Sequence, residues 1–177
     1  LERLYNHGDD FVLNVSSPNT PNLRRLQNRE LLELLLQTVM AFVKRQAQVK
    51  PIALKIAPDL GWEQLDEILE LAHQYGVAAI IATNTTLARD GLHTDPKQQG
   101  GLSGQPLKAR SLEILHYLVH HSKLPTISVG GIGSPEDAHV RLEAGATLVQ
   151  LYSGFVFAGP LLPRHIARSL CQNPAKL

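Results

Sequence analysis

Residues 11–20 begin with a short apolar run rich in β-favouring residues and end in amide and hydroxyl side chains. The apolar start is typical of a strand buried on both faces. Buried amides and hydroxyls cost free energy unless they are hydrogen-bonded, so polar residues at the end of such a strand require partners. Pro18 keeps Ser17 out of the helical region and has no N–H, which fixes how the Ser17 side chain is presented. The cluster fits either a binding site or an ordinary turn, and consists of Asn14, Ser16, Ser17, Asn19 and Thr20.

Lys55 lies inside the apolar run 52–57, where a charge is costly without a purpose. A cation at this place can stabilise negative charge on a reduced flavin ring. A desolvated amine can instead form a Schiff base with a carbonyl substrate. In a third reading, the ammonium group extends beyond the end of the sheet into solvent. Lys55 by itself leaves the three readings open.

Thr83, Asn84 and Thr85 follow the next apolar run and bring hydroxyls and an amide to one strand end. These mixed donors and acceptors suit a planar substrate with carbonyl, N–H and carboxylate edges. A threonine-rich loop with local backbone hydrogen bonds is the alternative.

Glycines follow the last two predicted strands, at Gly130–Gly131 and in Tyr152–Ser153–Gly154. Barrels of alternating strands and helices often bind phosphate at this place, beside the start of a short extra helix. Glycine lets backbone N–H groups approach an anion, and a helix N-terminus favours negative charge. The glycines therefore predict a phosphate site, without distinguishing a flavin phosphate from a sugar phosphate.

These polar residues and glycines follow the strands in a sequence that alternates between strands and helices. This alternation predicts a parallel α/β sheet with the polar residues at its carboxyl edge. A long polar loop, 87–106, includes the glycine-rich segment 100–104 and is expected to be functional because of its length. We expect a strand that begins at Phe11, further strands at 52–57, 77–82, 126–129 and 147–151, and helices at 29–48, 62–75, 107–122, 135–145 and 160–170.

The composition is that of an ordinary globular protein: 177 residues, 44% hydrophobic, 19% charged, with a net charge of +1. We therefore predict a single domain over 1–177. No basic tract interleaved with aromatics indicates nucleic acid. Cys171 is the single cysteine, so a disulfide framework and a cysteine-based metal site are not expected. We find no signal peptide, and no apolar run nears the roughly 20 residues of a membrane helix.

The segment Asn14-Val-Ser-Ser-Pro-Asn-Thr20 closely resembles the quinone-dependent (class 2) dihydroorotate dehydrogenases, FMN enzymes of pyrimidine biosynthesis. Cytosolic members of the wider family carry Cys where this chain has Ser17. Residues 53–59 also resemble the family's flavin-contacting strand, which favours the flavin reading of Lys55. The resemblance implies the carboxyl-terminal part of an FMN-binding parallel β/α (TIM) barrel, with strands missing upstream. The absence of an initial Met, and a start at 1–8 that reads as a last helical turn closed by Gly8, also suggest a fragment.

The resemblance further implies oxidation of (S)-dihydroorotate to orotate. Ser17 would remove the C5 proton while hydride passes from C6 to FMN, and a quinone would reoxidise FMN. Thr20 is a candidate first step for the proton that Ser17 loses, and the loop after Pro18 is a candidate lid. By this resemblance, substrate contacts are Asn14, Asn19, Asn84 and Thr85, and FMN contacts are Asn14, Lys55, Thr83, Gly104, Gly131, Tyr152 and Ser153.

Two alternatives remain open at this stage. One is a phosphate-binding aldolase or isomerase barrel with Lys55 as the Schiff-base lysine. The other is an inactive half-barrel unable to hold a cofactor. Peripheral membrane contact is expected only from the family class, through segments absent from this chain.

Overall fold

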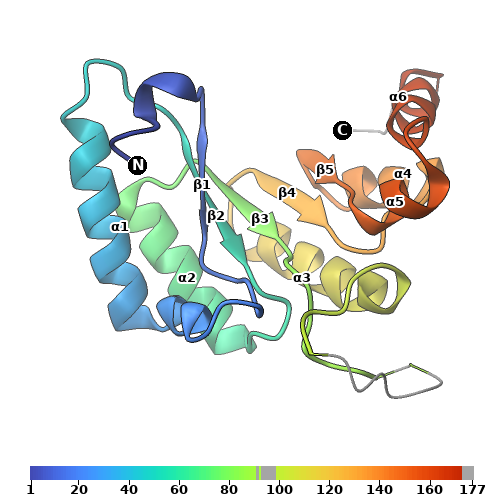
Figure 1. The fold of residues 1–177 in the computed structure, drawn as a ribbon, viewed down its shortest axis with the longest axis horizontal. Coiled ribbons are helices and arrows are strands. Elements are labelled where there is room, and N and C mark those ends of the chain that lie inside the picture. The colour runs from blue at the N-terminus through green and yellow to red at the C-terminus, as the bar shows by residue number, and fades with distance from the viewer. Residues whose placement is uncertain (91, 93–98, 173–177) are drawn as a thin grey trace.

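The computed structural model describes residues 1–90, 92 and 99–172. Their strands form a parallel sheet in which each strand pairs with the next one in sequence (Figure 1). The predicted parallel α/β class is therefore confirmed. The strands are β1 (Phe11–Asn14), β2 (Ile52–Ile56), β3 (Ala79–Ala82), β4 (Thr126–Val129) and β5 (Leu148–Gln150).

Helices connect the strands, as the crossover between parallel strands requires. The α-helices are α1 (Arg29–Lys44), α2 (Trp62–Tyr75), α3 (Lys108–His121), α4 (Pro135–Glu143), α5 (Ser153–Ala158) and α6 (Leu162–Gln172). Short 3-10 helices are η1 (Tyr5–His7), η2 (Leu23–Gln27) and η3 (Gln105–Leu107).

The main core lies between the sheet and the helices α1, α2 and α3. Leu54 of β2 and Ile80 of β3 are fully buried there, against residues such as Leu65 of α2 and Ile114 of α3. Side chains alternate across a strand, so Lys55 points to the opposite face of the sheet from Leu54. This alternation separates the core from the site.

Strand β1 is not buried on both faces, contrary to the sequence prediction. Phe11 and Leu13 are half-buried, whereas Val12 is 46% exposed and Asn14 is also exposed. Helices cover one face of β1, and no described residue buries the other face to a comparable extent. Strand β1 therefore has the alternating burial of a sheet with one covered face.

The last predicted helix, 160–170, corresponds to α6, and the short helix α5, which begins at Ser153, precedes it without having been given bounds from the sequence. Gly159 separates α5 from α6 with φ at +84°, a conformation that glycine adopts without strain. Helix α1 ends at Lys44, earlier than expected, where Arg45 and Gln46 side chains donate to carbonyls of its last turn. Gly8 follows η1 in an extended conformation and is not the left-handed cap that we predicted.

In the part of the chain that the structure describes, no helix is long and apolar enough to cross a membrane. Within the same residues, no group of three or more His, Cys, Asp or Glu side chains could hold a metal ion.

We predict that Leu54→Ala lowers the free energy of unfolding by about 2–5 kcal/mol, because it removes buried methyl groups and leaves a cavity. Leu34→Ala is the control, since Leu34 is 61% exposed on α1. Urea denaturation of both variants measures the difference. Equal losses would contradict the placement of the core.

Candidate active site

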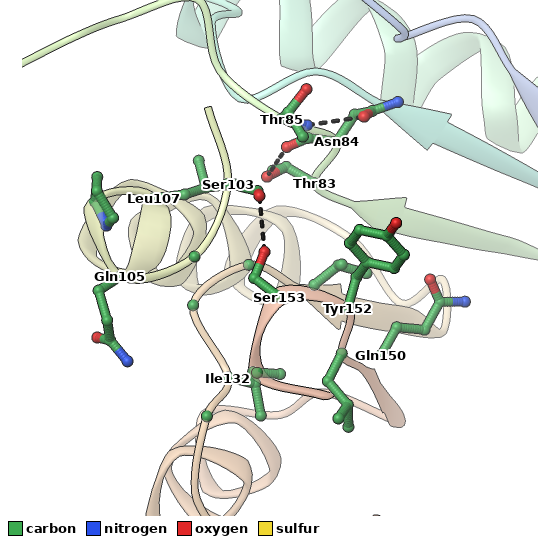
Figure 2. A pocket seen from close by; sticks show the side chains of 18 of the residues that line it. Thr83, Asn84, Thr85, Ser103, Gln105, Leu107, Ile132, Gln150, Tyr152 and Ser153 are labelled. Atoms are coloured by element: carbon green, nitrogen blue, oxygen red, sulfur yellow. Dashed lines mark hydrogen bonds between the residues drawn. The ribbon is translucent and has the colours of Figure 1, made fainter. Parts of the chain in front are cut away.

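A cavity of about 950 Å³ opens at the carboxyl end of the sheet (Figure 2). Its volume is typical of small-molecule sites. Side chains and backbone from the ends of β2, β3, β4 and β5 line it, together with the segment before α3. The predicted site residues in its lining are Lys55, Thr83, Asn84, Thr85, Gly104, Gly131, Tyr152 and Ser153.

Asn84 connects this lining to the polar cluster after β1. Its Nδ2 donates to Asn14 Oδ1 at 3.2 Å and to Ser16 Oγ at 3.0 Å, and its Oδ1 accepts from the Thr85 N–H at 2.8 Å. Ser16 Oγ in turn donates to Asn14 Oδ1 at 3.0 Å. The loop that carries Ser17 is therefore joined to the cavity through Ser16 and Asn84.

Ser17, Asn14 and Asn19 themselves lie beside the cavity and not in its lining. The Ser17 hydroxyl accepts from the Asn19 N–H at 3.3 Å, a local turn contact. Among the described residues, no hydrogen bond joins Ser17 to Thr20, so the proton relay stays a prediction.

Lys55 is paired in register with Asn14 of β1 and with Ile81 of β3. Burial lowers the pKa of the Lys55 ammonium from its ordinary value, and no neighbouring carboxylate raises it again. When it is protonated, the Lys55 amine attracts an anionic or electron-rich ligand in the cavity.

Segment 100–104 closes directly over Thr85. The Cβ of any side chain at Gly101 would lie 1.7 Å from Thr85 Oγ1 and 2.8 Å from Pro18 Cγ, so only glycine fits. The covered Thr85 hydroxyl is buried and has no hydrogen-bond partner among the described residues. A buried hydroxyl without a partner costs about 1–3 kcal/mol, so a ligand that accepts its proton would be favoured.

Three backbone segments meet at the other end of the cavity, where Gly131 and Gly154 leave no room for a Cβ. A Cβ at Gly131, where φ is +71°, would lie 2.4 Å from Lys108 Cβ, and one at Gly154 would lie 2.3 Å from the Ile132 oxygen. The Ser103 and Ser153 hydroxyls are hydrogen-bonded at 2.7 Å across this meeting point (Figure 2). Backbone N–H groups can approach a phosphate here, as in other glycine-rich anion sites. We call these segments, 103–105, 130–133 and 152–154, the glycine cradle.

A buried arginine fixes the glycine cradle from behind. Arg141 of α4 is 1% exposed, and its Nη2 donates at 2.8 Å to the carbonyls of Gly130 and Lys108 and to Ser111 Oγ. Burial lowers the pKa of the Arg141 guanidinium, an effect that the nearby Asp137 carboxylate opposes.

The Asp137 side chain stabilises the turn at Gly133, just before α4. It is hydrogen-bonded to the Lys108 ammonium and accepts from the Gly133 N–H at 2.8 Å. Burial by itself raises the pKa of Asp137, but these hydrogen bonds outweigh it and hold the pKa below its ordinary value.

Sequence reasoning did not single out Ser103, Gln150, Arg24, Asp59 or Arg141. Ser103 could have been found from its position between glycines in segment 100–104. Gln150 is the last residue of β5 and lines the cavity. It could have been found in the same way as Asn14, as a polar residue at the end of an apolar strand. The others are single charged residues in a polar loop or a short helix, and no spacing marks them.

The comparisons with known proteins agree with one family. The family model described as dihydroorotate dehydrogenase matches residues 1–173. A dihydroorotate dehydrogenase (quinone) from Christiangramia forsetii is 49% identical over 176 residues, which cover 98% of this chain and 52% of the relative. One from Thermus thermophilus is 50% identical over 172 residues, covering 96% of this chain and 48% of the relative.

Solved structures give the same family at lower identity. Ligand-free dihydroorotate dehydrogenase from Eimeria tenella matches with a TM-score of 0.91 at 31% identity, covering 99% of this chain and 55% of that chain. The complex of the Eimeria tenella enzyme with ferulenol matches with a TM-score of 0.86 at 31% identity, covering 93% and 50%. The chain thus spans about half the length of the curated relatives it matches.

We predict that Gly131→Ala weakens FMN binding at least about tenfold, because the strained φ and the contact with Lys108 displace N–H groups from a phosphate. Riboflavin, which lacks the phosphate, should lose much less affinity. Fluorescence titration of the full-length apoprotein with both flavins measures the two changes. Gly76→Ala is the matched control, because Gly76 has φ at +76° and open space around its Cβ position. Equal losses of FMN and riboflavin affinity in Gly131→Ala would contradict the phosphate assignment.

We predict that Lys55→Met raises the melting temperature of the ligand-free protein at neutral pH, because the charged amine is penalised by burial. The gain should shrink as pH rises toward the ordinary lysine pKa of 10.5. With a lowered pKa, folded Lys55 loses its proton at a lower pH than unfolded Lys55, so wild-type stability rises through that window. Melting curves at neutral and alkaline pH measure this effect, with exposed Lys44→Met as the control. A gain that does not change with pH would be the contrary result.

Proposed function

Because the chain belongs to the dihydroorotate dehydrogenase family, we propose that the full-length protein oxidises (S)-dihydroorotate to orotate in pyrimidine biosynthesis. The activity is proposed for the full-length protein, since this chain spans about half of its relatives.

The shared cavity is the main support for this function. Lys55, Asn84 and Gly131 come from separate strand ends and line one space. Had their side chains or backbone faced different sides of the molecule, a common flavin and substrate site would have been untenable. Ser17 lies beside this cavity. The preceding residue, Ser16, accepts a hydrogen bond from Asn84.

The residues present fit FMN. Within the glycine cradle, Gly131 and Gly154 have no room for a Cβ, and backbone N–H groups there would suit a phosphate. Lys55 and Thr83 both line the cavity, and the Lys55 ammonium would bring a positive charge to a bound flavin. FMN, when bound, supplies the acceptor for the hydride of the substrate. The residues that we propose to hold it are Asn14, Lys55, Thr83, Gly104, Gly131, Tyr152 and Ser153.

Amides and hydroxyls at the ends of β1 and β3 would bind the substrate. Asn14, Asn19 and Asn84 present donors and acceptors suited to its carbonyl, N–H and carboxylate edges. The buried Thr85 hydroxyl without a described partner is consistent with a ligand at this end of the cavity.

Ser17 would take the C5 proton of dihydroorotate as hydride leaves C6. A serine hydroxyl is a poor base at neutral pH, so its own proton must pass on, with Thr20 or water as the next acceptor. The substrate thereby loses one proton and one hydride, which is the difference in composition between dihydroorotate and orotate.

A quinone is the proposed final electron acceptor, from the names of the relatives. Peripheral membrane association is proposed on the same ground, through segments outside this chain. The Schiff-base alternative for Lys55 is set aside, since the relatives compared above are dihydroorotate dehydrogenases.

We predict that Ser17→Ala leaves bound FMN spectrally unchanged but slows its reduction by dihydroorotate about 10²-fold or more, because proton removal contributes that much to such reactions. Ser17→Cys should keep part of the rate, since a thiol serves in the related class. Anaerobic stopped-flow absorbance of the full-length protein measures the rates.

The control variant is Ser122→Ala, between α3 and β4 at the opposite end of the sheet. An unchanged rate of flavin reduction in Ser17→Ala would remove Ser17 from the mechanism. Wild-type protein that dihydroorotate does not reduce would overturn the proposed function itself.

A further inference from the structure

Arg24 lies in η2, in the loop that follows Ser17, and each of its three guanidinium nitrogens donates to a different segment. Nε donates to the Ser16 carbonyl at 3.0 Å, and Nη2 donates to the Thr85 carbonyl at 2.6 Å. Nη1 forms an ion pair with Asp59 Oδ2 at 2.6 Å. One side chain therefore connects the ends of β1, β2 and β3.

Asp59, which follows β2, extends these connections. Its Oδ2 also accepts from the Leu87 N–H at 3.1 Å, and its Oδ1 accepts from the Thr86 hydroxyl. The arginine and aspartate side chains are only 19% and 29% exposed. We call this pair, with its backbone partners, the Arg24–Asp59 clamp.

The Arg24–Asp59 clamp holds the two segments that the proposed chemistry needs close together. Ser16, whose carbonyl Arg24 binds, directly precedes Ser17, and Pro18 restricts Ser17 from the other side. Thr85, whose carbonyl Arg24 also binds, follows Asn84. A planar guanidinium fixes the direction of each hydrogen bond, which a flexible ammonium group cannot do.

Arg24 does not line the cavity, so it acts through other residues. We propose, building on the proposed function, that Arg24 and Asp59 are positioning residues that hold Ser17 against the substrate-binding end of β3.

The Arg24–Asp59 clamp also limits which part of the loop after Pro18 can act as a lid. Gln27 of η2 accepts from the Ala57 N–H at 2.8 Å, so η2 is held to the end of β2 at a second point. Residues 18–21 carry none of these attachments. A closing motion in this loop is therefore restricted to those residues.

The test compares Arg24→Gln and Arg24→Lys with Arg29→Gln in the full-length flavoprotein. Arg29 is a matched control, because it also forms an ion pair, with Glu70 through two hydrogen bonds of 2.7 and 3.0 Å, but on the exposed surface of α1 and α2. Arg24→Gln should slow flavin reduction at saturating dihydroorotate about 10- to 100-fold, as displaced catalytic groups do. FMN affinity should stay within about twofold of wild type, because the glycine cradle is untouched.

Two further readouts separate positioning from general destabilisation. Amide hydrogen exchange in residues 16–28 should speed up in Arg24→Gln and not in Arg29→Gln. Added methylguanidine should restore part of the rate in Arg24→Ala, because it can occupy the vacated guanidinium place. Arg24→Lys should stay slow despite its charge, since an ammonium group lacks the planar geometry.

The outcomes divide cleanly. Faster exchange together with slower reduction supports the positioning role. Faster exchange with an unchanged reduction rate, or unchanged exchange, overturns it. Failure of the proposed function is a separate result, because then dihydroorotate would not reduce the wild-type flavin, while the exchange measurement would still report on the Arg24–Asp59 clamp.

Discussion

The carboxyl edge of the sheet depends on a buried positive charge, the Arg141 guanidinium. A guanidinium taken out of water is destabilising unless protein acceptors replace the lost solvent. Its partners are Ser128 of β4, the Gly130 carbonyl and the first turn of α3. Moving any of these away would leave charge unpaired in the interior, so the strand, the glycine loop and the helix keep one mutual arrangement.

Two arginines thus complete the two halves of the site. Arg24 binds carbonyls at the ends of β1 and β3, and Arg141 binds those at the end of β4 and the start of α3. Carbonyls just beyond the end of a strand lack the regular partners of the ladder and must be satisfied otherwise. Lys55 lies on β2, between β1 and β3 in the order of the sheet, and lines the cavity at this edge.

Much of the fold follows from local patterns in the sequence. Ser134 caps α4 by accepting from the Asp137 N–H at 3.2 Å, and Gly76 ends α2 in the left-handed conformation, both common choices at these helix positions. The five strands were placed to within about two residues because parallel strands are short apolar runs with polar ends. The exposed face of β1 was missed because burial on a second face depends on what packs there, which the strand's own residues do not specify.

The sequence predicted only those site residues that lie at the ends of strands. Lys55, Asn84 and Gly131 share a cavity because parallel strands bring their ends to one edge. Arg24 and Asp59 are 35 residues apart in sequence, and only the folded loops bring them together.

The order of the strands in the sheet has a consequence for the kinetics of folding. Each of β2 to β5 pairs with the strand just before it in sequence, so during synthesis each of these strands finds that neighbour already made, without waiting for distant chain.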